Sequence, residues 1–463
     1  MDKFDEKLKQ MAQSESWEIP DNIDSNISRL LNDIDKPKKA KKKPLKVAVL
    51  VASISLFTIT TAFAIENIIE YFNYNKESAY ISSQEELTTL GNSVNLSIKE
   101  NGIEFTIDSI SVDANYINVF YTIKSDKTIE YYYKILDEKK PKEADFAKPF
   151  IFAEIDGEPL KVSGINENEA TYISENELKG MERINAVHHD IKNSFDIKIY
   201  TDEIFGEKGN WSISTKVDKS KAVEKTRQYN INKDIKIKES YDLDGKDVNI
   251  THKLNIDKIT LSPFANQIVI KEKVNQIGDY ELKIGGNFAL FDDENNSLDI
   301  LDKGLEVDDT TGMANNTFEF LKANIDTKYL TFVPIGYTDI QEEMIEPQDI
   351  DNLPIVLEMN EYGKIVIENI EITDKQIKYT YYKDGVVMGD PSLWFLDEEG
   401  KEIQLSYAID RAVNRHTGRH TITLSLEGHN VKPSEIAKIK KITTYNNNIK
   451  LRYDESVKIE LNS

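Results

Sequence analysis

The sequence predicts a mainly β protein with a short cytoplasmic helical tail, one transmembrane helix, and then tandem Ig-like antiparallel β-sandwich domains. Three observations predict this class. From about residue 90 onward, apolar and polar residues alternate with the period of strands. A pair of strand motifs recurs three times at domain-sized spacing. Residues 47–65 carry no charge and are close to the roughly 20 residues that a membrane-spanning helix needs.

Composition excludes several classes of function. The chain has 463 residues, with 81 acidic and 58 basic side chains, a net charge of −23 and no cysteine. That length predicts about three domains. Without cysteine there is no disulfide scaffold, no thiolate zinc site and no cysteine nucleophile. The acidic excess argues against nucleic acid as a partner, because phosphate binding needs a basic surface.

The candidate membrane segment, VAVLVASISLFTITTAFAI, follows a block of lysines, KPKKAKKKPLK, at residues 36–46. Basic flanks stay in the cytoplasm. We therefore predict a single-pass protein of the cell membrane, with residues 1–46 inside and the C-terminal part outside. The topogenic residues are Lys36, Lys38, Lys39, Lys41, Lys42, Lys43 and Lys46.

Two other interpretations of residues 47–65 are a cleaved signal peptide and a buried core helix. Ala62, Phe63 and Ala64 fit the small-x-small cleavage pattern. However, the charged region ahead of the segment is much longer than a secretory n-region, and the lysine block argues against a core helix. Helical spacing also continues through Ile68 and Phe72. We expect a retained anchor, followed by a juxtamembrane helix and linker at 66–90.

The tail contains an amphipathic pattern after Trp17 and Pro20, in which Asp21 or Asn22 is the expected N-cap. Helices this short cannot bury enough apolar surface to fold alone. They either dock on a protein partner or stay solvated beside the inner leaflet, and the pattern leaves both open. The residues of the candidate docking stripe are Trp17, Ile23, Ile27, Leu30, Leu31 and Ile34.

The repeated motif has two parts. The first part is IDSISV at 107–112, IDKITL at 256–261 and IENIEI at 367–372, each followed by a second alternating segment. The second part is an apolar strand that ends in an acidic turn: IFAEIDG at 151–157, FALFDDEN at 288–295 and LWFLDEEG at 393–400. The same order at domain-sized spacing predicts three related sandwiches, at 91–217, 236–340 and 354–463.

Several of these segments together resemble a family of Firmicute membrane proteins. They are W-x-I-P-x-x-I-D from Trp17, the lysine block, the hydrophobic segment, N-G-I-x-x-T-I from Asn101 and G-x-W at Gly209. The family is the domain of unknown function 4179, and Ser262-Pro263-Phe264 resembles the Ig-like domain that often follows it. The resemblance implies an anti-sigma or signal-sensing regulator with a sigma factor as its cytoplasmic partner. The tail here is shorter than a full anti-sigma domain.

No catalytic motif, such as a P-loop, H-E-x-x-H or G-x-S-x-G, is present. His416 and His420 have the spacing of metal ligands on a helix, but Gly418 and the strand pattern disfavour that helix. His188 and His189 are expected in a loop or at the edge of a strand. We therefore expect no enzyme, no cofactor and no metal site.

One acidic segment and two segments rich in tyrosine also have simple structural interpretations. The acidic stretch at 292–296 lacks the glycine and glutamate of an EF-hand loop, so we expect a solvated hairpin turn there. The tyrosines at 131–133 and 379–382 are expected to pack in strands with their hydroxyls at the rim.

Two functions remain from sequence. The first is a transmembrane regulator whose exterior senses a cell-wall or extracellular ligand and whose tail binds a cytoplasmic partner. The second is a structural or adhesive surface protein with a passive anchor. The amphipathic stripe in the tail favours the first, because a passive tail has no need of a spaced apolar face.

Overall fold

The structure is a computed structural model that describes residues 61–76, 78–160, 167–243, 246–277, 280–282, 287–308, 312–321, 323–337, 342–427, 429 and 431–461. All of these residues belong to one compact unit, Ser53–Ser463. The predicted tail, its docking stripe and its lysines lie outside the described residues.

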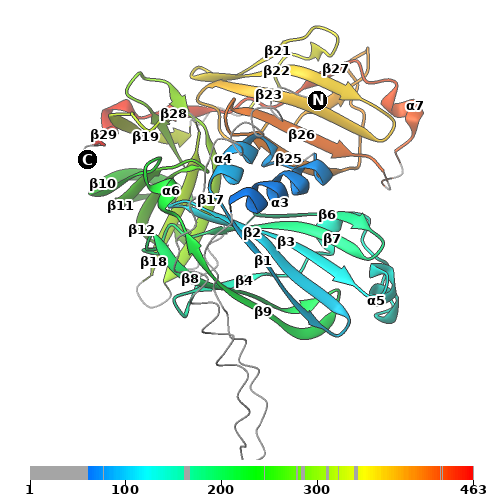
Figure 1. Cartoon of the computed structure of the whole chain (residues 1–463). Coiled ribbons are helices and arrows are strands. Elements are labelled where there is room, and N and C mark those ends of the chain that lie inside the picture. The colour runs from blue at the N-terminus through cyan, green and yellow to red at the C-terminus, as the bar shows by residue number, and fades with distance from the viewer. Residues whose placement is uncertain are drawn as a thin grey trace, which may run out of the picture. The chain divides into compact units, whose positions relative to one another are not determined.

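Strands make up 55 % and helices 11 % of this part of the chain. The strands form three sandwiches, in each of which a five-stranded antiparallel sheet shares its core with a second sheet (Figure 1). The helices are α3 (Thr61–Tyr74), η1 (Ile81–Ser83), α4 (Gln84–Thr89), α5 (Ile129–Ile135), η2 (Ala144–Phe146), α6 (Ser220–Val223), α7 (Pro433–Ile436) and η3 (Tyr453–Glu455).

The first sandwich pairs the sheet β1-β2-β3-β7-β6 with the sheet β5-β4-β8-β9. Trp211 is fully buried between them, and its indole N–H donates to the carbonyl of Ile103 at 3.0 Å. The strands are β1 (Gly91–Glu100), β2 (Ile103–Val112), β3 (Tyr116–Ser125), β4 (Phe152–Ile155), β5 (Glu158–Pro159), β6 (Glu167–Ser174), β7 (Glu177–Asn185), β8 (Ser194–Ile204) and β9 (Glu207–Asp218).

The second sandwich pairs the sheet β10-β11-β12-β18-β17 with a sheet built on β15, β16 and β19. In its core, Phe288 stacks on Phe332 and contacts Phe318 edge to face. The strands are β10 (Arg227–Leu243), β11 (Lys246–Leu261), β12 (Asn266–Lys273), β13 (Asn275–Ile277), β14 (Tyr280–Leu282), β15 (Phe288–Phe291), β16 (Ser297–Leu298), β17 (Ile300–Asp308), β18 (Met313–Phe320) and β19 (Tyr329–Tyr337).

The third sandwich pairs the sheet β21-β22-β23-β26-β25 with the sheet β20-β27-β24. Tyr379 and Tyr381 are buried in its core. The strands are β20 (Gln348–Asp349), β21 (Ile355–Asn360), β22 (Gly363–Ile372), β23 (Gln376–Gly385), β24 (Trp394–Leu396), β25 (Ala408–Asn414), β26 (Arg419–Ser425) and β27 (Lys441–Thr443).

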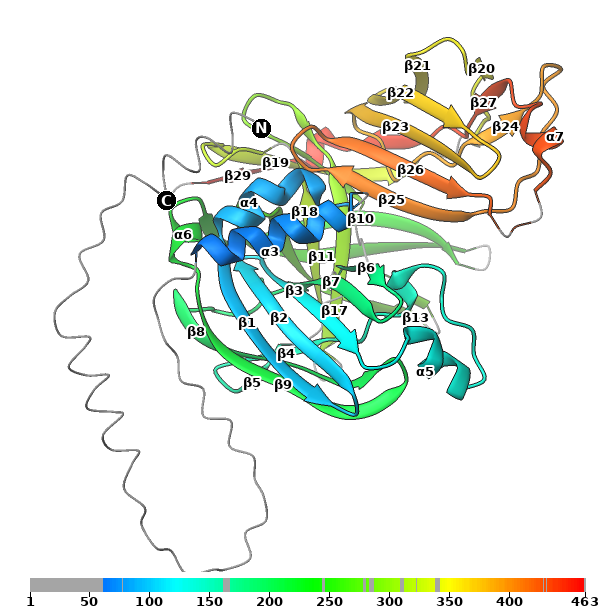
Figure 2. The same cartoon turned by 45° about the vertical axis from the view of Figure 1, so that its right-hand side comes forward.

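The last two strands of the chain, β28 (Ile449–Leu451) and β29 (Val457–Glu460), both pair with β19 of the second sandwich. Figure 2 shows β29 beside β19, and Ile459 contributes to the second core. The domain predicted at 354–463 included these strands. The chain therefore returns to the second sandwich after it has completed the third.

The three five-stranded sheets have the same order, in which three consecutive strands are neighbours and a reversed hairpin follows. This order is not the ABED and CFG arrangement of an immunoglobulin domain, so the Ig-like part of the prediction is wrong. In the first sandwich, short turns between consecutive strands are the physical reason for the observed strand order. Asn101 and Gly102, both at positive φ, form a two-residue hairpin turn that returns β2 beside β1.

The repeated I-[DE]-x-I motif encodes a β-bulge. Isoleucines three positions apart point to opposite faces of a regular strand. In each sandwich, however, the pairing register shifts between the first isoleucine and the residue two positions later, so that Asp108, Asp257 and Glu368 are the extra residues. The bulge lets both isoleucines of each motif face the same core.

The predicted transmembrane helix is a further error in the fold class. Within the part of the chain that the structure describes, no helix is long and apolar enough to cross a membrane. Residues 47–60 of the predicted span lie outside that part, and residues 61–65 begin α3. The apolar side of α3, formed by Ile68, Tyr71 and Phe72, is covered by protein: it packs against Phe120 of β3.

We predict that Gly180→Ala destabilises the first sandwich. A Cβ at Gly180 would lie 2.2 Å from Cζ of the buried Tyr121 ring, so the sheet would have to shift. Overpacking of this kind costs about 1 to 3 kcal/mol in the free energy of unfolding, measurable by urea denaturation. The matched control is Gly336→Ala, whose Cβ meets only Arg452 Cδ at 3.5 Å. Equal stability of the two variants would contradict the prediction.

Candidate functional site

The structure separates the two histidines that have metal-ligand spacing. His420, on β26, lies with Nε2 2.6 Å from Asp299 and stacks on Tyr381. His416 lies in the turn before it and faces Glu86 of α4, at 3.3 Å. In the described part of the chain, no three His, Cys, Asp or Glu side chains are grouped so as to hold a metal ion. Both histidines therefore make contacts between elements.

The other singled-out residues also have structural roles. His188 contacts the second sandwich through Thr317, at 3.0 Å. The stretch at 292–296 forms the expected turn, which joins β15 to β16. The prediction that the tyrosines at 131–133 lie in a strand is wrong, because they lie on α5, where Ile129 and Tyr132 provide a buried helical face.

A buried carboxylate joins all three sandwiches. Glu319 of β18 is 1 % exposed and pairs with Arg183 of β7 at 3.1 Å and with Arg415, beside β25, at 2.7 Å. The Tyr116 hydroxyl of β3 donates to the same carboxylate at 2.8 Å. We call these four residues together with Tyr80 the junction cluster. It brings charges from three separate sandwiches to one point.

The electrostatics of this cluster favour the ionised carboxylate. Burial alone would raise the pKa of Glu319, but the two guanidinium groups and the hydrogen bonds from Arg415 and Tyr116 hold it well below its usual value. Because water is excluded from Glu319, its charge depends on both arginines. Loss of either contact leaves a buried charge partly uncompensated.

Tyr80 connects the junction cluster to the helices at the start of the described chain. Its ring lies 5.1 Å from Arg183 Cζ and 4.7 Å from Arg415 Cζ. Tyr80 lies in the turn of a helical hairpin made of α3, η1 and α4. Figure 1 shows this hairpin between the first sandwich and strands β25 and β26 of the third. The hairpin is thus positioned by both sandwiches.

Glu169 of β6 holds the turn of the helical hairpin. Its carboxylate accepts hydrogen bonds from the Ala79 backbone N–H at 2.8 Å, from the Ser78 hydroxyl and from the Tyr71 hydroxyl at 3.2 Å. Burial, the largest effect, raises the pKa of Glu169 to about 7. The carboxyl is therefore part protonated near neutral pH, while its partners fix the segment that carries Tyr80.

A polar joint fastens the first sandwich to the second. The fully buried Asp113, in the turn after β2, accepts hydrogen bonds from the Ser262 hydroxyl at 2.7 Å and the Phe264 N–H at 2.9 Å. Asn115 donates to the Ala265 carbonyl at 2.7 Å. The Ser262-Pro263-Phe264 element noted in the sequence therefore acts as a docking loop between sandwiches.

A second joint fastens the second sandwich to the third. Asp299, between β16 and β17, pairs with Lys383 of β23 at 2.9 Å and with His420. Burial opposes ionisation, but the His420 hydrogen bond and the Lys383 charge lower the pKa of Asp299 below its usual value. The Tyr381 hydroxyl donates to Asp390 beside this joint, at 2.6 Å.

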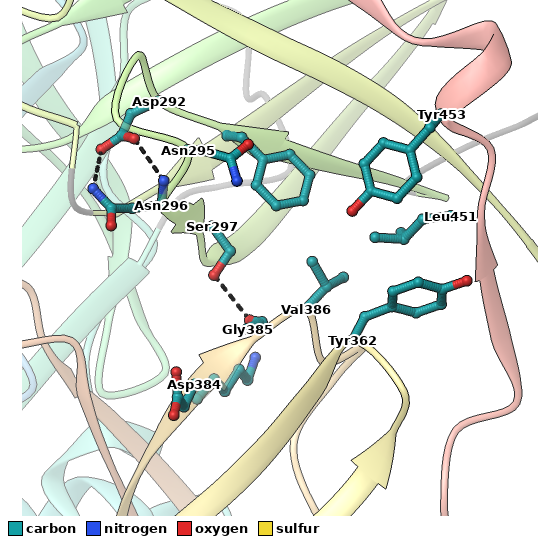
Figure 3. Close-up of a pocket in the computed structure, with 12 residues that line it drawn as sticks. Asp292, Asn295, Asn296, Ser297, Tyr362, Asp384, Gly385, Val386, Leu451 and Tyr453 are labelled. Carbon is teal, nitrogen blue, oxygen red and sulfur yellow. Dashed lines mark hydrogen bonds between the residues drawn. The ribbon is translucent and has the colours of Figure 1, made fainter.

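An open groove lies along this second joint (Figure 3), with a volume of about 510 Å³. The turn at 292–296 of the second sandwich forms one side. The side chains of Tyr362 and Tyr453 stand on the other, and Val386 and Leu451 line the space between them. The groove is thus built from both sandwiches and from the returning C-terminal segment.

The buried carboxylates of Glu319 and Asp299 are already paired with arginine, lysine or histidine side chains. The groove instead offers aromatic faces and polar groups open to solvent, which is how ligand sites are commonly lined.

Sequence patterns did not reveal the junction cluster. Glu319 lies between Phe318 and Phe320 in a strand of alternating pattern, where a charged residue is expected to face solvent. Arg183 and Arg415 occur in equally ordinary settings. Only the packing of one sandwich on another makes these positions buried. A weak signal existed for the Asp113 joint, because the Ser-Pro-Phe loop carries an aromatic residue, Phe264, where a polar turn is expected.

The fold and its joints define a β-rich protein of three sandwiches that pack on one another. Residues 36–125 match the model of a family described as "Domain of unknown function (DUF4179)". This match supports the family resemblance over the segment that includes the helical hairpin and β1 to β3. No curated protein matches the chain.

One solved structure similar to this chain is "The crystal structure of the conserved domain protein from Bacillus anthracis". The two are 16 % identical, and the match covers 63 % of this chain and 85 % of that chain with a TM-score of 0.34. A likeness at that level carries no argument about function.

We predict that Glu319→Gln strongly destabilises the protein, because it leaves two buried guanidinium groups without their shared carboxylate. Breaking a buried ion pair in this way costs about 3 to 5 kcal/mol. Urea denaturation measures the loss. The control is Glu435→Gln, which removes an exposed pair with Lys438 and costs about 0.5 kcal/mol or less. A cost at Glu319 as small as that of the control would contradict the assigned role.

We predict that Glu169 makes stability rise as the pH falls from 7.5 to 5. The unfolded carboxyl has a pKa near 4.3, whereas the folded one has a pKa of about 7, so the folded state holds a proton that the unfolded state releases. Relative to Glu169→Gln, the native chain should gain about 2 to 3 kcal/mol over this range. The free energy of unfolding of both proteins is measured by denaturation at each pH. The same pH dependence in the two proteins would contradict the prediction.

Proposed function

We propose that this chain is a signal-sensing regulator. Its sandwiches bind a ligand, and residues 1–46 bind a protein partner, which the family resemblance suggests is a sigma factor. One observation carries this proposal: the helical hairpin, which connects the N-terminal segment to the sandwiches, contacts the junction cluster through Tyr80. Among the described elements, the one nearest the tail in sequence is therefore also the one on which the sandwiches converge.

This arrangement supports coupling between the two ends of the protein. Arg415 and His416 reach the hairpin from the third sandwich, while Arg183 reaches it from the first. A ligand that favours one placement of the sandwiches over another would change these contacts. The hairpin would then shift or loosen, and the segment leading to the tail would follow.

The alternative function, a structural or adhesive surface protein with a passive tail, gives no role to these contacts. A passive anchor needs only a linker before the first sandwich. Here the hairpin is packed on the first sandwich through Tyr71 and Phe72 and is also paired with the third through Glu86. We also propose that the protein has no enzymatic activity, which its paired carboxylates support.

We further propose that the protein acts at the cell membrane. The lysine block at 36–46 supports this location, because segments with several lysines are attracted to anionic lipid surfaces.

If the chain is such a regulator, the binding of its partner depends on the apolar stripe of the tail. We expect the full chain to retain a sigma factor from lysate of its own host, and the double variant Ile27→Asp, Leu31→Asp to lose it, because both changes place charges on the stripe. Mass spectrometry of the retained proteins is the measurement. The matched control is Asn26→Asp, Asn32→Asp, which adds the same charges beside the stripe. Equal retention by all three proteins would contradict the proposal.

A further inference from the structure

The groove of Figure 3 offers two kinds of surface that face each other. On one side stand the rings of Tyr362 and Tyr453, with Phe291 nearby at 6.4 Å from the Tyr453 ring centroid. On the other side stand the amides of Asn295 and Asn296. A ligand that fills the groove must therefore present an apolar face to the rings and hydrogen-bonding groups to the amides.

The aromatic side is accessible. Tyr453 is 56 % exposed, although tyrosine normally buries its ring, and its hydroxyl points into the groove in Figure 3. The buried side chains of Val386 and Leu451 also line the groove. The floor is thus apolar and held by both neighbouring sandwiches.

The amide side is fixed in advance. Asp292 accepts hydrogen bonds from the Asn296 N–H at 2.7 Å and from the Asn296 side chain at 2.9 Å. Asn295 lies at φ 66°, a left-handed conformation that this turn maintains. A turn held in this way gives a ligand ordered polar groups without an entropic cost at the moment of binding.

The charge of the groove argues for a neutral ligand. Among the described residues that line the groove, Lys383 is the only cation, and it is 5 % exposed and bound to Asp299. Asp384 faces Lys364 at 3.5 Å, and Asp292 is engaged in its own turn. The groove therefore presents neither a free cation for a phosphate or carboxylate nor a free acidic pair for a cation.

We propose that this groove binds a neutral oligosaccharide. A sugar ring carries one face of C–H groups, which stack on aromatic rings, and a rim of hydroxyls, which bond to amide and carboxylate groups. The proposal rests on the proposed function, since it names the class of ligand that the sensor takes. Because the groove spans the joint of Asp299 and Lys383, a bound sugar chain also fixes the second sandwich against the third.

Calorimetric titration of the full chain tests this proposal. The probes are three tetrasaccharides: β-1,4-linked glucose, β-1,4-linked N-acetylglucosamine and α-1,4-linked glucose. We expect at least one of them to bind. Tyr453→Ala and Tyr362→Ala should each weaken that binding tenfold or more, and Tyr453→Phe should weaken it less because the ring is kept. Tyr407→Ala, which removes a similarly exposed ring outside the groove, should leave binding unchanged.

Thermal unfolding of each variant shows that it is folded before its binding is compared. No heat of binding with any of the three sugars, or unchanged binding by the variant that lacks both Tyr362 and Tyr453, would overturn the proposal. Binding of a neutral tetrapeptide such as tetra-alanine, in place of the sugars, would overturn it too. Partner capture by the tail is measured separately, so failure here leaves that result intact, and the reverse also holds.

Discussion

The buried carboxylate of Glu319 is the interaction on which the arrangement of the sandwiches depends. The attraction within a buried ion pair offsets the free energy of desolvation only when all of its charged partners are in place. Glu319 has two such partners, Arg183 from one sandwich and Arg415 from another. The cluster therefore penalises any placement in which one sandwich is displaced. Apolar surfaces alone would impose no such condition, because they tolerate sliding. The Asp113 and Asp299 joints repeat the same principle at two further contacts.

The position of the helical hairpin follows from this cluster. Its apolar side packs on Phe120 and Met181, which ties it to the first sandwich, while the ring of Tyr80 lies against both arginines of the junction. Glu169 fixes the turn between the helices. The hairpin therefore responds to the placement of two sandwiches at once, which suits an element that joins a tail to a sensing domain. A ligand in the groove of Figure 3 would act on the contact between the second and third sandwiches.

The repeat could be predicted from sequence because one short motif, I-[DE]-x-I, recurs in all three sandwiches and requires the same β-bulge in each. Two isoleucines three positions apart must share a core, and only a bulge at Asp108, Asp257 and Glu368 allows this. The strand order was not predictable in the same way, because it depends on turns such as Asn101-Gly102 that act one hairpin at a time. The pairing of β28 and β29 with β19 could not be predicted either, because alternating apolar and polar residues identify a strand but not the strand beside it. Only residues 61–65 of the predicted span are described, and they begin α3, whose apolar side is formed by residues after the span and packs on Phe120. Apolar character alone does not reveal whether protein or lipid covers a segment.

The central claim is that the junction cluster holds the helical hairpin in place. Hydrogen–deuterium exchange of the backbone amides in the hairpin tests it most directly, comparing the native chain with Arg415→Met, which keeps the length of the side chain but removes its charge. The account predicts exchange at least tenfold faster in α4 and the turn before it, with unchanged protection of β22 and β23 in the third core. Unchanged exchange in the hairpin, with Arg415→Met otherwise folded, would contradict the account.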